Sequence, residues 1–261
     1  MDPYMTYSQL KASAKARMKP LRGTLIAAAA ISLGFNLAVL LFFSRIRLPF
    51  VRSYVIQYIL RLLFWTMSNT LRGMLKAGFH YLSLKICCDK PASPGDIFYA
   101  FSHQTGNAFL LSVFMSMIVV VPMIPYNIAA YWWSPTDMDH SILWMLLLLT
   151  GIPAAILTAI LRLAYSQAFY LMLDFPSLSV KQLLQNSRHI MLGHKKRFFF
   201  IQLRQTLLLM IVCLFTCFIG GLWITPFLYM VDTQFYLDLV TKQDQITSPQ
   251  AAGHLAFCPR E

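Results

Sequence analysis

Three basic side chains recur at intervals of four residues within one largely apolar stretch: Arg72, Lys76 and His80. Side chains at this spacing project from the same face of an α-helix. A cation inside an apolar span is costly, and it usually faces a wet cavity or an oppositely charged partner. The three could therefore line an anion path or hold a lipid phosphate. The default, structural interpretation is that they reach the membrane surface or pair with an acid such as Asp232, in the last apolar run.

A second basic group is continuous in sequence and comprises Lys195, Lys196 and Arg197. It follows a segment that starts with Ser179 and has a glutamine three residues later, the spacing of a helix-starting capping box. Gly193 can end that helix. Apolar and polar residues fall on opposite faces of the segment, so we expect a short helix lying flat at a membrane interface. The three cations would then contact anionic lipid headgroups and anchor the next span.

Motifs for catalysis are absent from the sequence. It contains no phosphate-binding glycine loop, no paired catalytic carboxylates and no metalloprotease helix, and Glu261 is its only glutamate. We therefore predict a protein that is not an enzyme, with no catalytic residue, no metal site and no bound cofactor.

The composition places the chain in a membrane. Hydrophobic residues make up 57% and charged residues only 12% of 261 positions, which is too apolar for an ordinary soluble domain. The net charge of +12 could suggest nucleic acid as a partner. The basic residues, however, cluster at the ends of apolar runs, as in membrane proteins, so we predict no nucleic-acid binding.

Three regions follow from the pattern of apolar runs. Residues 1–23 form a basic amphipathic segment, in which Leu10 and Ala14 lie opposite Lys11 and Lys15. Residues 24–240 form a transmembrane helical domain, and residues 241–261 form a flexible tail. About 20 apolar residues cross a bilayer, and six runs within the middle region are long enough: 24–43, 50–88, 108–131, 142–173, 198–217 and 222–240.

The charges of the connecting segments predict the orientation of the chain. An even number of crossings puts both termini on one side. The connection 132–140 contains Asp137 and Asp139 but no lysine or arginine, whereas the N-terminal segment, the loops 85–107 and 174–197 and the tail all contain basic residues. We therefore expect both termini in the cytoplasm. The arginines at positions 45, 47 and 52 run against this rule in the first hairpin.

Several stretches resemble a bacterial integral-membrane family, domain of unknown function 975, found mainly in Gram-positive organisms. They are LKASAKARMKPLRG, GDIFYAF, GIPAAILTAILRLAYSQAFYLMLDFPSLS, NSRHIMLGHKKRFF and GGLWITPFLYMVDTQFYLDL. Ala154 and Phe227 depart mildly from the Pro-Gly and Pro-Tyr pairs of the family. The resemblance implies a multi-spanning plasma-membrane protein without an established activity, and it transfers no catalytic or ligand residues.

We thus expect an all-α, polytopic membrane bundle of about six transmembrane helices with short amphipathic interfacial helices. The first functional hypothesis is a non-enzymatic envelope scaffold or accessory protein. The second is a small transporter or a lipid- or anion-handling protein that uses Arg72, Lys76 and His80; an enclosed cavity reaching that face would favour it. A membrane enzyme is the third. The expected partners are membrane lipids with anionic headgroups at the cytoplasmic face, and the sequence leaves a protein partner or homo-oligomer open.

Overall fold

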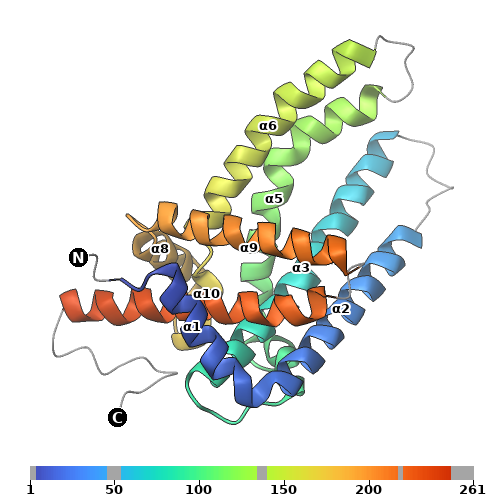
Figure 1. Cartoon of the computed structure of the whole chain (residues 1–261). Helices are drawn as coiled ribbons and strands as arrows, with labels where there is room; N and C mark the ends of the chain where they lie inside the picture. The colour runs from blue at the N-terminus through green and yellow to red at the C-terminus, as the bar shows by residue number, and fades with distance from the viewer. Residues whose placement is uncertain (1–3, 46–53, 134–139, 217–219, 248–261) are drawn as a thin grey trace.

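The computed structural model describes residues 4–45, 54–133, 140–216 and 220–247, and all regular structure in these ranges is helical (Figure 1). The predicted all-α fold is thereby confirmed for the described part of the chain. The helices are α1 (Tyr7–Met18), α2 (Arg22–Arg45), α3 (Tyr54–Cys87), α4 (Tyr99–Ser102), α5 (Thr105–Trp133), α6 (His140–Ala164), α7 (Ala168–Asp174), α8 (Val180–Ile190), α9 (Lys195–Phe215) and α10 (Gly221–Thr247), with 3-10 turns η1 (Lys19–Leu21) and η2 (Pro94–Phe98).

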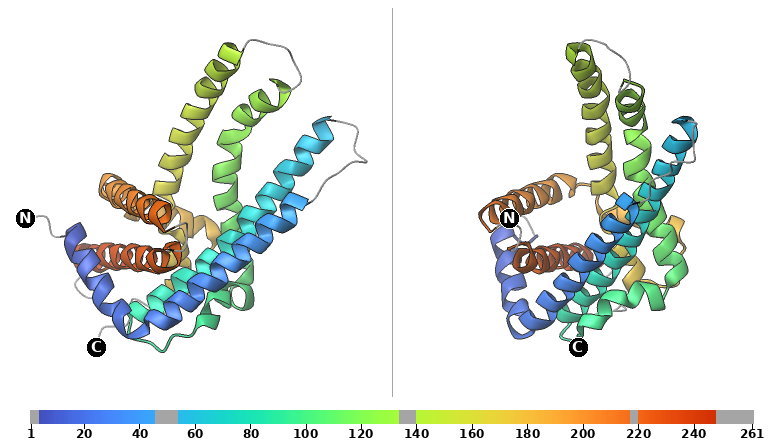
Figure 2. Two further views of the ribbon diagram at one scale, coloured as in Figure 1. Left: turned by 45° about the vertical axis from the view of Figure 1, so that its right-hand side comes forward. Right: turned by 90° about the vertical axis from the view of Figure 1, so that its right-hand side faces the viewer.

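Four helical stretches in these ranges are long and apolar enough to cross a membrane: Tyr7–Phe42, Thr105–Ile128, Trp144–Asp174 and Lys195–Phe215. By length and composition, these stretches are candidate membrane spans. The long helices pair as three antiparallel hairpins, α2 with α3, α5 with α6 and α9 with α10 (Figures 1 and 2). In every view α9 and α10 run across the direction of α5 and α6. Helices that cross in this way do not share one membrane normal, so the number of six crossings stays a prediction.

Two boundaries differ from those that the apolar runs predict. The run 142–173 is divided into α6 and α7, because the chain turns at residues 165–167. The Ser166 hydroxyl donates to the Leu163 carbonyl at 3.0 Å and competes there with the helical ladder. At the other end, α10 continues past position 240 to Thr247, into the predicted tail. The rest of that tail, like Asp137 and Asp139 of the predicted external connection, lies outside the described residues.

The capped helix expected after Ser179 is present as α8. The Ser179 backbone N–H donates to the side-chain Oε1 of Gln182 at 3.0 Å, and Gly193 follows the helix with a φ of +82°. Its apolar face is packed on protein rather than free for lipid. Leu183 and Ser187 are fully buried, and the Ser187 hydroxyl donates to the Ala164 carbonyl at 3.2 Å.

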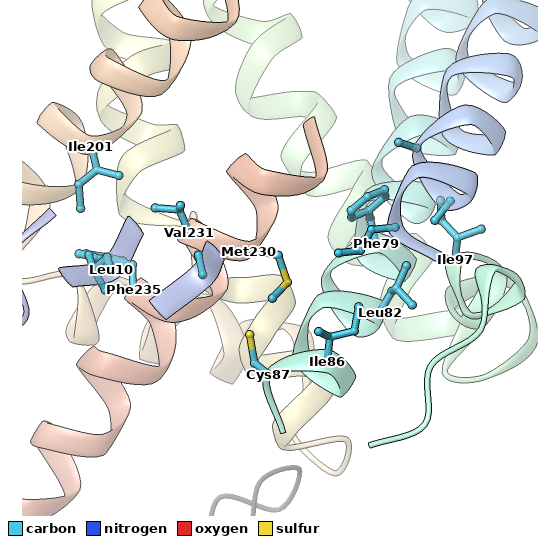
Figure 3. Close-up of a cluster of buried hydrophobic side chains, with 14 of the residues drawn as sticks. Leu10, Phe79, Leu82, Ile86, Cys87, Ile97, Ile201, Met230, Val231 and Phe235 are labelled. Atoms are coloured by element: carbon cyan, nitrogen blue, oxygen red, sulfur yellow. The ribbon is translucent and has the colours of Figure 1, made fainter. Parts of the chain in front are cut away.

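Helix α1 is likewise held by the protein. Its apolar residues Leu10 and Ala14 are fully buried and belong to a core shared with α3, α9 and α10 (Figure 3). On α3, Phe79 contributes to this core and stacks on Tyr229 with ring centroids 4.3 Å apart. The amphipathic pattern of residues 1–23 therefore reflects packing against α10, and a position at the membrane interface stays a prediction.

Gly78 fixes the contact between α3 and the turn η2. A Cβ built on this glycine would lie 1.7 Å from the carbonyl oxygen of Ile97, where no side chain fits. The backbone of η2 therefore rests directly on α3. This contact anchors the segment between the first and second hairpins.

Candidate anion-binding cavity

A cavity of about 910 Å³ lies between α3, α5, α6, α9 and α10 and the turn before α7. This volume is within the range of pockets that hold small organic ligands. Its charged lining residues are Arg72 and Lys76 from α3, Arg162 from α6 and Asp232 from α10, and His80 lies beside them. The structure thus brings together the three residues that the four-residue spacing places on one helix face.

The wall between α3 and α5 is formed by a close backbone approach. A Cβ on Gly73 would lie 2.9 Å from the side-chain Cβ and Oγ of Ser112, so only glycine fits there without a shift. One turn away on α3, Lys76 is surrounded by protein atoms, and yet its side chain is accessible. These two observations agree because the accessible surface of Lys76 faces the cavity that it lines.

The basic groups of the cavity form no direct ion pair with any described carboxylate. Within the described ranges, no carboxylate oxygen lies within 4.0 Å of a side-chain nitrogen of Arg72, Lys76 or Arg162. The Arg72 Nε, which is buried, also lacks a hydrogen-bond partner there. Arg72 is half-buried and Lys76 and Arg162 are accessible, and like charges that line one cavity repel one another. The positive charge of the lining therefore favours binding of an anion in the cavity.

Asp232 shares the cavity, but glutamine amides satisfy its carboxylate. The Gln202 Nε2 donates to Oδ1 and Oδ2 at 2.9 and 3.0 Å, and the Gln205 Nε2 donates to Oδ1 at 3.1 Å. Lys76 is near enough to interact electrostatically with both Asp232 and Arg162. The acid that sequence analysis offers as a partner for the α3 cations is thus a neighbour without being an ion-pair partner.

Uncharged polar atoms without partners gather in the same place. Both ring nitrogens of His80, the hydroxyls of Ser112 and Thr158 and the Gln167 Oε1 are buried and lack a hydrogen bond to any described residue. All four residues line the cavity. Buried polar groups are nearly always hydrogen-bonded, so this concentration indicates a site for polar ligand atoms or water.

His80 lines the cavity from within a cluster of aromatic rings. Its ring is 3% exposed and packs among aromatic rings, with centroids 4.2 Å from Tyr170, 5.3 Å from Tyr229 and 6.1 Å from Phe169. These contacts fix the plane of the imidazole and keep it from moving toward the other basic groups.

A family model described as "Protein of unknown function (DUF975)" matches residues 5–243. The chain belongs to the DUF975 family. The match contains every residue that lines the cavity, and it confirms the family resemblance of the sequence. Neither the curated proteins nor the solved structures gave a match. The DUF975 description names no activity, so the function has to be argued from the cavity itself.

The second basic group of this DUF975 protein is divided between two environments. The Arg197 guanidinium forms an ion pair with the Asp238 carboxylate, at 2.7 Å between Nη2 and Oδ2, and also donates to the Met5 carbonyl. It lies over the rings of Tyr4 and Phe235, at 5.3 and 5.0 Å from their centroids. Arg197 therefore joins α9 to α10 and to the N-terminal segment.

The two lysines before it have a different setting. Lys196 is exposed and Lys195 is half-buried. Contact of these side chains with lipid headgroups stays a prediction. Next to them, burial and the Arg197 charge lower the pKa of His194, and Asp238 acts in the opposite direction.

The uncharged polar residues of the DUF975 cavity are not predicted from the sequence. Ser112, Thr158 and Gln167 are common residue types in membrane helices, and nothing in their spacing marks them. Gln202 and Gln205 carry a usable signal, because two amides three residues apart on an apolar helix share one face.

Proposed function

We propose that this DUF975 protein binds an anionic ligand inside a membrane, as a lipid- or anion-handling protein. One observation carries the proposal: Arg72, Lys76 and Arg162 line a single cavity and have no ion-pair partner among the residues that the structure describes. Charged side chains within membrane proteins typically mark the path or site of a charged ligand. An anion would supply the missing counter-charge, and each hydrogen bond to a charged donor contributes about 1.5–3 kcal/mol.

The cavity favours this hypothesis over an envelope scaffold. A scaffold needs an external partner surface, and it gains nothing from several cations held apart in an internal space. The same cavity supports binding rather than catalysis, because its basic groups suit an anion and its one carboxylate is engaged by two amides. We therefore propose a protein that is not an enzyme.

We further propose a location in the bacterial plasma membrane with both termini in the cytoplasm. The basic connecting segments support this orientation. Each hairpin contributes two crossings, and any even number of crossings puts the N-terminal segment and the tail on one side of the membrane. The cavity then lies toward the cytoplasm, because Arg162 and Ser166 sit at the end of α6 that leads into the basic segment around α8.

Thermal unfolding in a neutral detergent tests the anion site. A ligand present at 100 times its Kd stabilises the folded protein by about 2.7 kcal/mol. Inorganic phosphate should therefore raise the Tm more than sodium chloride of equal ionic strength. The variant R72Q/K76Q/R162Q should lose that difference, and R61Q, on the same helix α3 but outside the cavity, should keep it. Equal stabilisation of the triple variant and the wild type would contradict the proposal, and K76Q alone serves if the triple variant does not fold.

A further inference from the structure

We infer that the ligand of this cavity is a phospholipid with a phosphomonoester headgroup, and that it enters sideways between α6 and α9. The inference rests on the proposed function and gives its ligand a chemical class. It follows from the charge of the cavity, from its mixed lining and from the position of its mouth.

The charge of the lining selects the headgroup. Arg72, Lys76 and Arg162 carry three positive charges and Asp232 one negative charge, which leaves a formal excess of two positive charges. A phosphomonoester carries between −1.5 and −2 at about pH 7, and its terminal oxygens accept several hydrogen bonds. A phosphodiester group carries only a single negative charge, and a zwitterionic headgroup carries no net charge. The two guanidinium groups also match phosphate oxygens in geometry.

Neutral donors complete the polar half of the site. The hydroxyls of Ser112 on α5 and Thr158 on α6 are buried, lack partners among the described residues and line the cavity. A hydroxyl can donate to a phosphate oxygen. A headgroup would thus satisfy groups that the described residues leave unpaired.

The other half of the lining is apolar. Met115, Val119 and Met123 come from α5, and Leu163 comes from α6. A free inorganic anion would gain nothing from these side chains. An amphiphile would place its phosphate among the cations and the start of its acyl chain along this wall, where each buried CH₂ group is favourable.

Part of the mouth of the cavity is apolar. Ala155 and Ala159 on α6 and Phe199 and Leu203 on α9 line the cavity and are also exposed at the surface, and Lys76, Arg162 and Thr206 share both properties and form its polar part. Residues with both properties mark the rim. The exposed face of α9 continues away from this rim with further large apolar side chains: Leu207, Met210, Ile211 and Leu214. An acyl chain leaving the cavity between α6 and α9 would therefore run into an apolar environment.

Native mass spectrometry of the whole chain tests the ligand class. Purified protein is incubated with equal amounts of phosphatidic acid, phosphatidylglycerol and phosphatidylcholine that have the same acyl chains. We expect phosphatidic acid to bind about tenfold more tightly than phosphatidylcholine, with phosphatidylglycerol between them. Glycerol 3-phosphate, which has the same phosphate without the chains, should bind much more weakly than phosphatidic acid.

Variants at the rim distinguish binding of a lipid from binding of a free phosphate compound. F199Q/L203Q should weaken phosphatidic acid binding about fivefold and leave glycerol 3-phosphate binding unchanged. F200Q is the matched control, because Phe200 is exposed on α9 but does not line the cavity. Thermal unfolding confirms that each variant is folded, and L203A replaces the double variant if that one is not.

The possible failures are distinguishable. Equal binding of the three lipids would overturn the phosphomonoester assignment. Glycerol 3-phosphate binding as tightly as phosphatidic acid, with no effect at the rim, would replace the lipid by a free phosphate and leave the proposed function intact. If no phosphate compound binds the wild type more tightly than R72Q/K76Q/R162Q, both the inference and the proposed function are overturned.

Discussion

Lys76 and Asp232 line the same cavity, yet their charged atoms lie more than 4.0 Å apart. The Asp232 carboxylate is held by the amides of Gln202 and Gln205 instead. A tight ion pair between the two residues would have been enough to explain why α3 carries cations within an apolar stretch. Their separation leaves the positive charge of the cavity available to a ligand.

Neutralising this carboxylate should therefore strengthen anion binding. Opposite charges attract and like charges repel by about 4 kcal/mol at 4 Å with an effective dielectric constant near 20, and by less at longer range. We expect D232N to bind phosphate or phosphatidic acid about three- to tenfold more tightly, as measured by titration of the Tm. D89N changes an exposed carboxylate outside the cavity and should leave the affinity unchanged. Weaker binding by D232N would show that Asp232 supports the ligand rather than competing with it.

Replacing Gly78 should destabilise the fold. G78A would put a methyl group 1.7 Å from the Ile97 carbonyl oxygen, so either α3 or η2 has to move. The expected loss is about 3 kcal/mol in the free energy of unfolding, measured by denaturant titration in detergent. G23A is the control, because a Cβ there meets nothing within 4 Å and alanine favours the helix. A G78A protein as stable as G23A would show that η2 does not rest on α3.

The ion pair between Arg197 and Asp238 should stabilise the protein internally. The Asp238 side chain is 1% exposed and that of Arg197 24%, and removing one partner of a buried pair costs about 3–5 kcal/mol. We expect R197Q and D238N each to lower stability by about 3 kcal/mol and the double variant to lower it by much less than the sum. K195Q and K196Q should have little effect on unfolding. Similar losses in all four single variants would point to a general role of charge in this region.

Acid should weaken the region around His194. Burial and the neighbouring Arg197 charge lower the pKa of this side chain in the folded protein, so the unfolded chain binds the proton more readily. The contribution of neutral His194 to the free energy of unfolding is fully present above the pKa of the unfolded state, about 6.5. It is lost as the pH falls toward the lower pKa of the folded state. The Tm should therefore decrease between about pH 7.5 and 5.5. H194Q should reduce this decrease and H189Q should not; an unchanged pH dependence in H194Q would contradict the assignment.

Local patterns were sufficient to predict the long helices, apart from the break between α6 and α7 and the end of α10, and to predict one wall of the cavity. The four-residue spacing puts Arg72, Lys76 and His80 on one face, and the caps at Ser179 and Gly193 depend on neighbouring residues only. The approach of Asp232 to that face and its amide partners depend on how α9 and α10 pack. No sequence period encodes such packing.

The second basic group shows the same limit. Three adjacent cations at the start of an apolar run indicate a membrane anchor, and this interpretation treats them alike. Arg197 differs because its partner Asp238 lies 41 residues further along the chain. Similarly, the apolar face of α8 predicts burial correctly, but the pattern does not distinguish a lipid surface from a protein surface.

The most direct measurement of the central claim is ³¹P–¹⁵N dipolar dephasing by solid-state NMR. The protein, labelled with ¹⁵N in arginine and lysine side chains, is placed in phosphatidylcholine bilayers that contain phosphatidic acid. The account predicts strong dephasing from the phosphatidic acid phosphorus in the wild type and in K195Q/K196Q, and its loss in R72Q/K76Q/R162Q. Dephasing that survives in the cavity variant and disappears in K195Q/K196Q would place the phosphate at the surface and contradict the account.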